Sequence, residues 1–130
     1  MVNTRRFYKE LGNLFYAIAA ADKKIRREER AQIEKEIQRT WRNHDHTTDR
    51  FGTDRAFLIE FEFEAMEDEN ETAETAYIRF ESFFEEYGNQ VDVPTRHSIF
   101  NSARHIAECV RKINTTELDY LMRLKKLMRV

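Results

Sequence analysis

A chain of 130 residues with 41% hydrophobic and 35% charged side chains can bury one hydrophobic core, so we expect a single domain over residues 1–130. Three glycines and one proline are too few for the many turns of an all-β fold, and the single cysteine, Cys109, excludes an internal disulfide. With a net charge of −2 and no concentrated basic face, the chain is not expected to bind nucleic acid.

Charge is distributed unevenly along the chain. Residues 1–50 carry 12 basic and 8 acidic side chains, residues 51–92 carry 2 and 13, and residues 93–130 carry 8 and 3. An acidic middle third therefore separates two basic ends. Two interpretations stay open: pairing within the fold together with solvated helix faces, or an acidic surface offered to a basic partner or to cations.

The N-terminal region contains no recognisable targeting signal. It becomes amphipathic after the first residues, without the apolar segment and cleavage site of a secretory signal. The longest apolar run, residues 14–21, is far shorter than the roughly 20 residues that span a bilayer. We therefore expect a cytoplasmic protein without a transmembrane segment.

Apolar residues at helical spacing predict two helices in the first part of the chain. The first covers roughly residues 4–22, with the apolar stripe Phe7, Leu11, Leu14, Phe15 and Ile18. The second covers roughly residues 27–42, with the stripe Ile33, Ile37 and Trp41. The polar residues 43–53 that follow predict a loop.

Residues 55–67 allow two interpretations. Phe57, Ile59, Phe61 and Phe63 alternate with polar residues as in a strand, whereas a helical stripe would contain Leu58, Phe61, Ala65 and Met66. A lone strand would have no partner elsewhere in the chain, so we predict a helix.

Three further helices complete the predicted domain. The stripe from Ala73 to Tyr87 predicts a helix that Gly88 ends, and Asp92 with Pro94 opens the next. Asn114 followed three residues later by Glu117 resembles a capping box for the last helix. That helix carries the apolar stripe Leu118, Leu121, Leu124, Leu127 and Met128. The prediction is an all-α domain of about six helices.

Two stretches of the chain coincide after a shift of 88 residues. Each copy is the end of one helix, a connection that contains an isoleucine, and a following helix with glutamate at its third position, where the positive helix end suits its charge. The matched pairs include Ile18 with Ile106, Ala19 with Ala107, Ile25 with Ile113, and Glu29 with Glu117. This repeat predicts two related helix pairs that bury apolar faces together; the alternative is chance similarity between amphipathic helices.

Residues 16–29, YAIAAADKKIRREE, resemble the signature of the tellurite-resistance TerB-like family. That signature has an alanine-rich helix end, Ala-Asp-Gly, a spacer, isoleucine or valine, and a glutamate. The second copy in this chain is residues 106–118, IAECVRKINTTEL. Lys23 and Arg111 stand where the family has glycine, and Val110 stands where it has the second aspartate. With the six helices, the resemblance covers most of the chain.

The resemblance implies an all-helical, non-enzymatic interaction module in tellurite and other stress responses, with protein partners. Related domains occur beside J-domain co-chaperones and in membrane-associated complexes. The oligomeric state stays open. In that family, acidic residues are proposed to bind metal ions, and Val110 removes one ligand from any symmetric two-motif site.

Asp22 is the main candidate site residue. It could hold a divalent cation together with Glu28 and Glu29, because hard cations prefer carboxylate oxygens. The alternative is structural: its carboxylate accepts backbone N–H groups in the connection and caps the second helix, or pairs with Lys23 or Lys24. Four basic side chains crowd the same segment and oppose a cation: Lys23, Lys24, Arg26 and Arg27. An EF-hand starting at Asp22 is excluded, since its ligand positions would be Lys24, Arg26 and Ile33.

The remaining polar clusters give weaker hypotheses. His44, Asp45, His46 and Asp49 could bind zinc, but they lack a further ligand at motif spacing, and a solvated loop is the alternative. No phosphate-binding loop or nucleophile elbow occurs, and Cys109 on an apolar helix is interpreted as a packed small residue, so no enzyme is expected.

Overall fold

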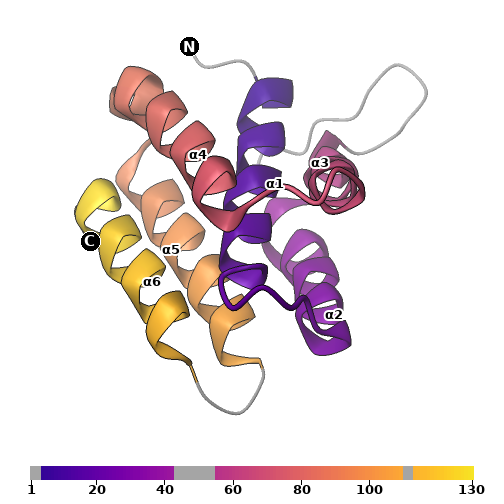
Figure 1. Ribbon diagram of the computed structural model, residues 1–130. Helices are drawn as coiled ribbons and strands as arrows, with labels where there is room; N and C mark the ends of the chain where they lie inside the picture. Colours follow the sequence, from indigo (N-terminus) through magenta and orange to yellow (C-terminus); the bar gives the residue numbers. More distant parts are fainter. Residues whose placement is uncertain (1–3, 43–54, 110–112) are drawn as a thin grey trace.

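The computed structural model describes residues 4–42, 55–109 and 113–130, and within these ranges the chain forms six α-helices and no strand (Figure 1). The helices are α1 (Thr4–Ala19), α2 (Arg27–Glu36), α3 (Leu58–Asp68), α4 (Ala73–Tyr87), α5 (Val93–Glu108) and α6 (Thr115–Met128). A π-helical segment, Ile37–Trp41, continues α2, and short 3₁₀ turns occupy Arg55–Phe57 and Gly88–Gln90. The all-α prediction is confirmed.

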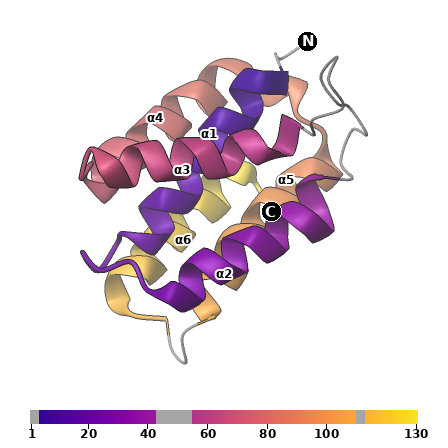
Figure 2. The same cartoon turned by 90° about the vertical axis from the view of Figure 1, so that its right-hand side faces the viewer.

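Helix α1 is the centre of the domain. It packs against α3, α4, α5 and α6, with α4, α5 and α6 on one side and α2 and α3 on the other (Figures 1 and 2). Every residue from Leu11 to Ala21 is buried, so the second half of this helix has no solvent-facing side. A helix that is surrounded in this way must be apolar on all faces, which accounts for its run of alanine and aromatic residues.

Helix α3 approaches α1 closely at Gly12. A Cβ atom at this position would lie 2.7 Å from the Ile59 carbonyl oxygen and 2.7 Å from the Glu62 Cβ. Such distances are too short for any side chain, so the missing Cβ of glycine allows the two helices to touch. This contact directs the Ile59 side of α3 toward the core.

The helix predicted for residues 55–67 is confirmed, but its predicted buried face is only partly correct. Met66 is buried as predicted, whereas Phe61 is 64% exposed, and Ile59 and Phe63 are buried instead. Two of the residues that alternate as in a strand, Ile59 and Phe63, are four apart and therefore also share one helix face. Leu118, predicted in the apolar stripe of α6, is likewise exposed.

Helix ends follow local capping chemistry with one difference from prediction. Helix α1 ends at Ala19, so Asp22 lies in the connection after the helix. Gly88 ends α4 as predicted, with right-handed backbone angles (φ −60°). The ring of Phe84, 2.7 Å from a Cβ at that position, is the reason for glycine there. Asp92 caps α5 as predicted, accepting the Thr95 N–H at 2.8 Å.

Ion pairs link the acidic middle third to both basic ends. Arg30 pairs with Glu67, and Arg123 reaches Glu74 at 2.8 Å. Pairing within the fold, one of the two interpretations of the charge pattern, is therefore present. None of the helices in the described ranges is both long and apolar enough to cross a membrane.

Candidate functional site

The turn that leads from α1 into α2 lies beside the start of α6, at one end of the bundle (Figure 2). The Asn114 side-chain amide lies 3.3 Å from Oδ2 of Asp22, although the two residues are 92 positions apart. Glu29 and Glu117 lie in the same region. We call Asp22, Glu29, Asn114 and Glu117 the acidic junction.

Asp22 organises the connection between α1 and α2. Its Oδ1 accepts the Lys24 N–H at 3.1 Å, and its Oδ2 lies 3.5 Å from Nη1 of Arg26. The predicted acceptance of a backbone donor is confirmed, but Asp22 does not cap α2, whose N-cap residue is Arg26. The ion pair of Asp22 is with Arg26 and not with the predicted Lys23 or Lys24. Arg26 is four residues further along the chain, and the turn brings its side chain back to Asp22. Asp22 therefore stabilises the turn between α1 and α2, and its hydrogen bond with Asn114 joins this turn to the start of α6.

The backbone at Lys23 is unusual. Its φ is +66°, in the left-handed region that favours glycine and costs free energy for a side chain. This is the position at which the TerB-like signature has glycine. The fold therefore demands at Lys23 the conformation that a glycine would adopt most readily.

Glu29 and Glu117 have the same role in their helices. Oε1 of Glu29 accepts the Arg26 N–H at 2.8 Å, and Oε1 of Glu117 accepts the Asn114 N–H at 3.2 Å. Asn114 completes the second capping box by accepting the Glu117 N–H at 2.8 Å, so the predicted cap of α6 is confirmed. Glu29 is 1% exposed and Glu117 is 4% exposed.

The two buried carboxyl groups interact across the junction, where Glu117 opposes the ionisation of Glu29. Burial raises the pKa of Glu29 to about 7, and repulsion from Glu117 and Asp22 adds to this. Burial also raises the pKa of Glu117, while a hydrogen bond from Glu29 lowers it. A proton that stays on Glu29 and is donated toward Glu117 accounts for both effects: Glu117 raises the pKa of Glu29, and Glu29 lowers the pKa of Glu117. Near neutral pH, the pair therefore tends to keep one proton.

The structure brings together only part of the predicted cation site. Asp22 and Glu29 converge, but Glu28 is exposed on the outer side of α2 and stays outside the junction. Glu117, which the structure adds, was not among the predicted site residues, although the 88-residue repeat pairs it with Glu29. Across the described ranges, no three histidine, cysteine, aspartate or glutamate side chains are placed to hold a metal ion.

The other predicted candidates are placed as follows. His44, Asp45, His46 and Asp49 lie outside the described residues. Cys109 donates its thiol to the Ile106 carbonyl at 3.0 Å, and burial raises its pKa to about 11. A thiol with that pKa is protonated at neutral pH, in agreement with a packed small residue rather than a nucleophile.

We expect Asp22→Ala to lower the free energy of unfolding by about 0.5–1.5 kcal/mol, the usual net contribution of a hydrogen bond to stability. The reason is that the Lys24 N–H and the Asn114 amide both lose their acceptor. Urea denaturation measures the change. Glu28→Ala is the matched control, because an exposed side chain outside the junction should change stability by less than about 0.5 kcal/mol. Equal effects of the two substitutions would contradict the role given to Asp22.

Comparison with known proteins identifies no relative of this chain: no family model matches it, and neither the curated proteins nor the solved structures contain a match.

Proposed function

We propose that this chain is a non-enzymatic TerB-like interaction module that acts in a stress response of the tellurite-resistance type, within a larger or membrane-associated complex. One observation carries the proposal. The two stretches that resemble the family signature are far apart in the sequence, yet Asp22 of the first lies against Asn114 of the second. A chance pair of amphipathic helices would have no reason to place its matched connections together.

Two further features support the resemblance. Lys23 has the left-handed backbone that the family's glycine would adopt. Ile25 and Ile113, the isoleucines of the two connections, are both partly buried and pack against the hydrophobic core. The matched placement of Ile25 and Ile113 is what a structural repeat would require.

Complementation in the native host tests this function. Deletion of the gene should reduce growth on potassium tellurite, and the wild-type chain should restore it. Lys23→Gly should restore growth equally, because it introduces the family's residue and relieves the left-handed strain at that position. Asp22→Ala should restore growth less well than Glu28→Ala. Unchanged tellurite tolerance in the deletion strain would contradict the proposal.

A second candidate is divalent-cation binding at the acidic junction, which would have to draw the carboxyl groups of Asp22, Glu29 and Glu117 together, because in the described part of the chain they are not placed to hold a metal ion. A cation would replace the proton that Glu29 and Glu117 keep between them, and would offset the burial and the repulsion that raise the pKa of Glu29. Arg26, beside Asp22, opposes this binding. Binding would therefore require deprotonation of Glu29 and a rearrangement of the junction.

Thermal melts at pH 8 with Mg²⁺, Ca²⁺ or Zn²⁺ test this candidate. A cation that binds only the folded chain stabilises it by about 2.7 kcal/mol at 100 times its Kd, so the melting temperature should rise with concentration. Glu117→Gln should abolish the rise, whereas Glu28→Gln should keep it. If no ion raises the melting temperature of the wild type, the acidic junction is not a cation site.

A further inference from the structure

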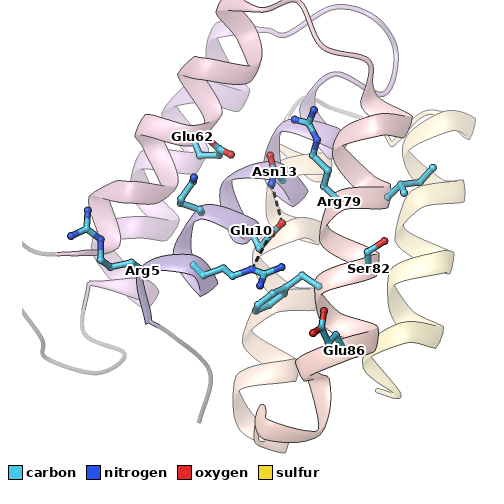
Figure 3. Close-up of a pocket in the computed structure, with 11 residues that line it drawn as sticks. Arg5, Glu10, Asn13, Glu62, Arg79, Ser82 and Glu86 are labelled. Carbon is cyan, nitrogen blue, oxygen red and sulfur yellow. Dashed lines mark hydrogen bonds and ion pairs between the residues drawn. The ribbon is translucent and has the colours of Figure 1, made fainter.

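Helix α3 has a hollow on each side. The hollow toward α4, of about 880 Å³, is lined by basic and acidic side chains together (Figure 3). Its most buried carboxylate, Glu10, already accepts a hydrogen bond from Asn13 at 2.9 Å and lies 3.9 Å from Nε of Arg6. This lining does not select a ligand by charge. The hollow toward α2 has a different lining.

A groove separates α2 from α3. The two helices make little direct contact, since α2 packs on α5 and α3 packs on α1 (Figure 2). Hollows of about 500 Å³ and about 100 Å³ lie between them and share Glu34 and Glu60, so they form one continuous groove. The ion pair of Arg30 with Glu67 bridges the two helices at its narrow end. The groove follows α2 from Arg30 to Arg39, a length of roughly 13 Å.

The floor of this groove is apolar. Ile33 and Phe63 lie at the bottom of the narrow part, and Ile37 lies at the bottom of the wide part. Where α3 begins, Phe57 is partly buried, and Phe61, one helical turn further on, is 64% exposed. An exposed aromatic side chain beside an apolar groove is typical of a surface that another protein covers.

Three carboxylates border the groove without a basic partner. Glu34 lies on α2, and Glu60 and Glu64 lie on α3. None of the three forms an ion pair within the described part of the chain, and Arg30, which lines the same part of the groove, pairs with Glu67 instead. Burial raises the pKa of Glu60, and repulsion from Glu34 across the groove and from Glu64 on its own helix adds to this. A positive charge placed over these carboxylates would offset the repulsion.

The outer edge of α2 carries the opposite charge. Lys35 and Arg39, about one turn apart, both line the wide part of the groove. No carboxylate among the residues that the structure describes pairs with either of them. The groove is therefore apolar along its floor, acidic where the two helices face each other, and basic along the outer edge of α2.

We propose that the groove between α2 and α3 docks an amphipathic helix of a partner protein, whose apolar stripe covers the floor and Phe61. Basic residues of that helix lie over the three unpaired carboxylates, and an acidic residue lies toward Lys35 and Arg39. An amphipathic helix binds a groove through anchors at positions i, i+3 or i+4 and i+7, which span about 11 Å and fit within this groove. The docking role rests on the proposed function as an interaction module, but not on the link of that function to tellurite.

A designed helical peptide tests the docking. The peptide carries a stripe of leucines with lysines along one edge and glutamates along the other, and the control peptide has serines in place of the leucines. Titration of the ¹⁵N-labelled chain with the leucine peptide should give saturable shifts of the backbone amides of α2 and α3, with a Kd below about 1 mM. The serine peptide should give no shifts at this concentration. The absence of shifts with the leucine peptide at about 1 mM would overturn the proposal. Shifts of the same amides that follow the concentration of the chain alone would assign the groove to a second copy and would also overturn it.

Substitutions at exposed positions locate the binding and should leave the chain folded. Phe61→Ser should weaken binding of the leucine peptide about tenfold, because it removes apolar contact area. Glu64→Lys should weaken it about threefold or more, because it places a positive charge beneath the lysine edge. Glu85→Lys is the matched control, since it makes the same change at an exposed position of α4, and its affinity should stay within about twofold. Equal weakening by Glu64→Lys and Glu85→Lys would contradict the docking site. The titration needs no host, so the groove can fail while complementation on tellurite succeeds, and the reverse.

Discussion

Replacing Glu29 with glutamine should raise the free energy of unfolding at pH 8 and leave it nearly unchanged at pH 5. The pKa of Glu29 rises from 4.5 to about 7 on folding, so the folded chain holds a proton that the unfolded chain has lost in this range. A raised carboxyl pKa gives stability that is fully present below the unfolded value and is lost as pH rises through the folded value. Wild-type stability should therefore fall between about pH 4.5 and pH 7.

The size of the effect follows from the shift. A change from 4.5 to about 7 corresponds to at most about 3 kcal/mol at pH 8. Glutamine carries no charge, retains an oxygen for the Arg26 N–H, and offers an amide N–H to Glu117, so it should recover much of this amount. Urea denaturation at the two pH values measures the gain.

One outcome would contradict this expectation, and another would favour the cation-binding candidate. Glu28→Gln removes the same charge from an exposed position and should give no comparable pH-dependent gain. If it stabilises as much as Glu29→Gln, general charge repulsion is the cause and not the buried pair. If Glu29→Gln destabilises the chain at pH 8 only when a divalent cation is present, the cation-binding candidate gains support instead.

Trp41→Ala should lower the free energy of unfolding by about 3–5 kcal/mol, the usual cost of truncating a large buried aromatic side chain. Trp41 is fully buried at the end of the π-helical segment and meets the Phe7 ring edge-on, with ring centroids 5.9 Å apart. Its indole N–H donates to Oγ of Ser102 at 3.1 Å, and Ser102 donates to the buried Glu36 at 2.8 Å. Truncation would leave both a cavity and an unpaired hydroxyl acceptor. Chemical denaturation measures the loss.

Trp41→Phe separates the two contributions. It keeps most of the ring volume but removes the N–H donor, so its cost should be clearly smaller than that of alanine. Ser102→Ala removes the hydroxyl from the other side and tests the same bond. A loss below about 1 kcal/mol for Trp41→Ala would show that this side chain does not hold the second helix against α1 and α5.

Local sequence patterns predicted most of the fold. Helix periodicity and caps depend on neighbours within four residues, so the helices and the Asn114–Glu117 capping box could be recognised from the chain alone. The buried face of α3 could not be recognised in this way. Its orientation depends on contact with Gly12, a residue about 50 positions away, and nothing in residues 55–67 reveals which side that contact selects.

The candidate sites were less predictable. The repeat aligned Glu29 with Glu117, yet sequence alone could not show that both carboxyl groups turn inward and meet. Glu28 has the same chemistry as its neighbour Glu29, and only its position on the helix keeps it at the surface.

The most direct test of the account is the titration of the Glu29 and Glu117 carboxyl carbons by ¹³C NMR. We expect the two groups to titrate as a coupled pair, with both resonances responding to one apparent pKa near the value of about 7 expected for Glu29. Glu117→Gln should remove the coupling and lower the pKa of Glu29. Independent titration of both carboxyl groups close to the ordinary glutamate pKa of 4.5 would show that the two helix pairs do not meet through a buried glutamate pair, and would contradict the central claim.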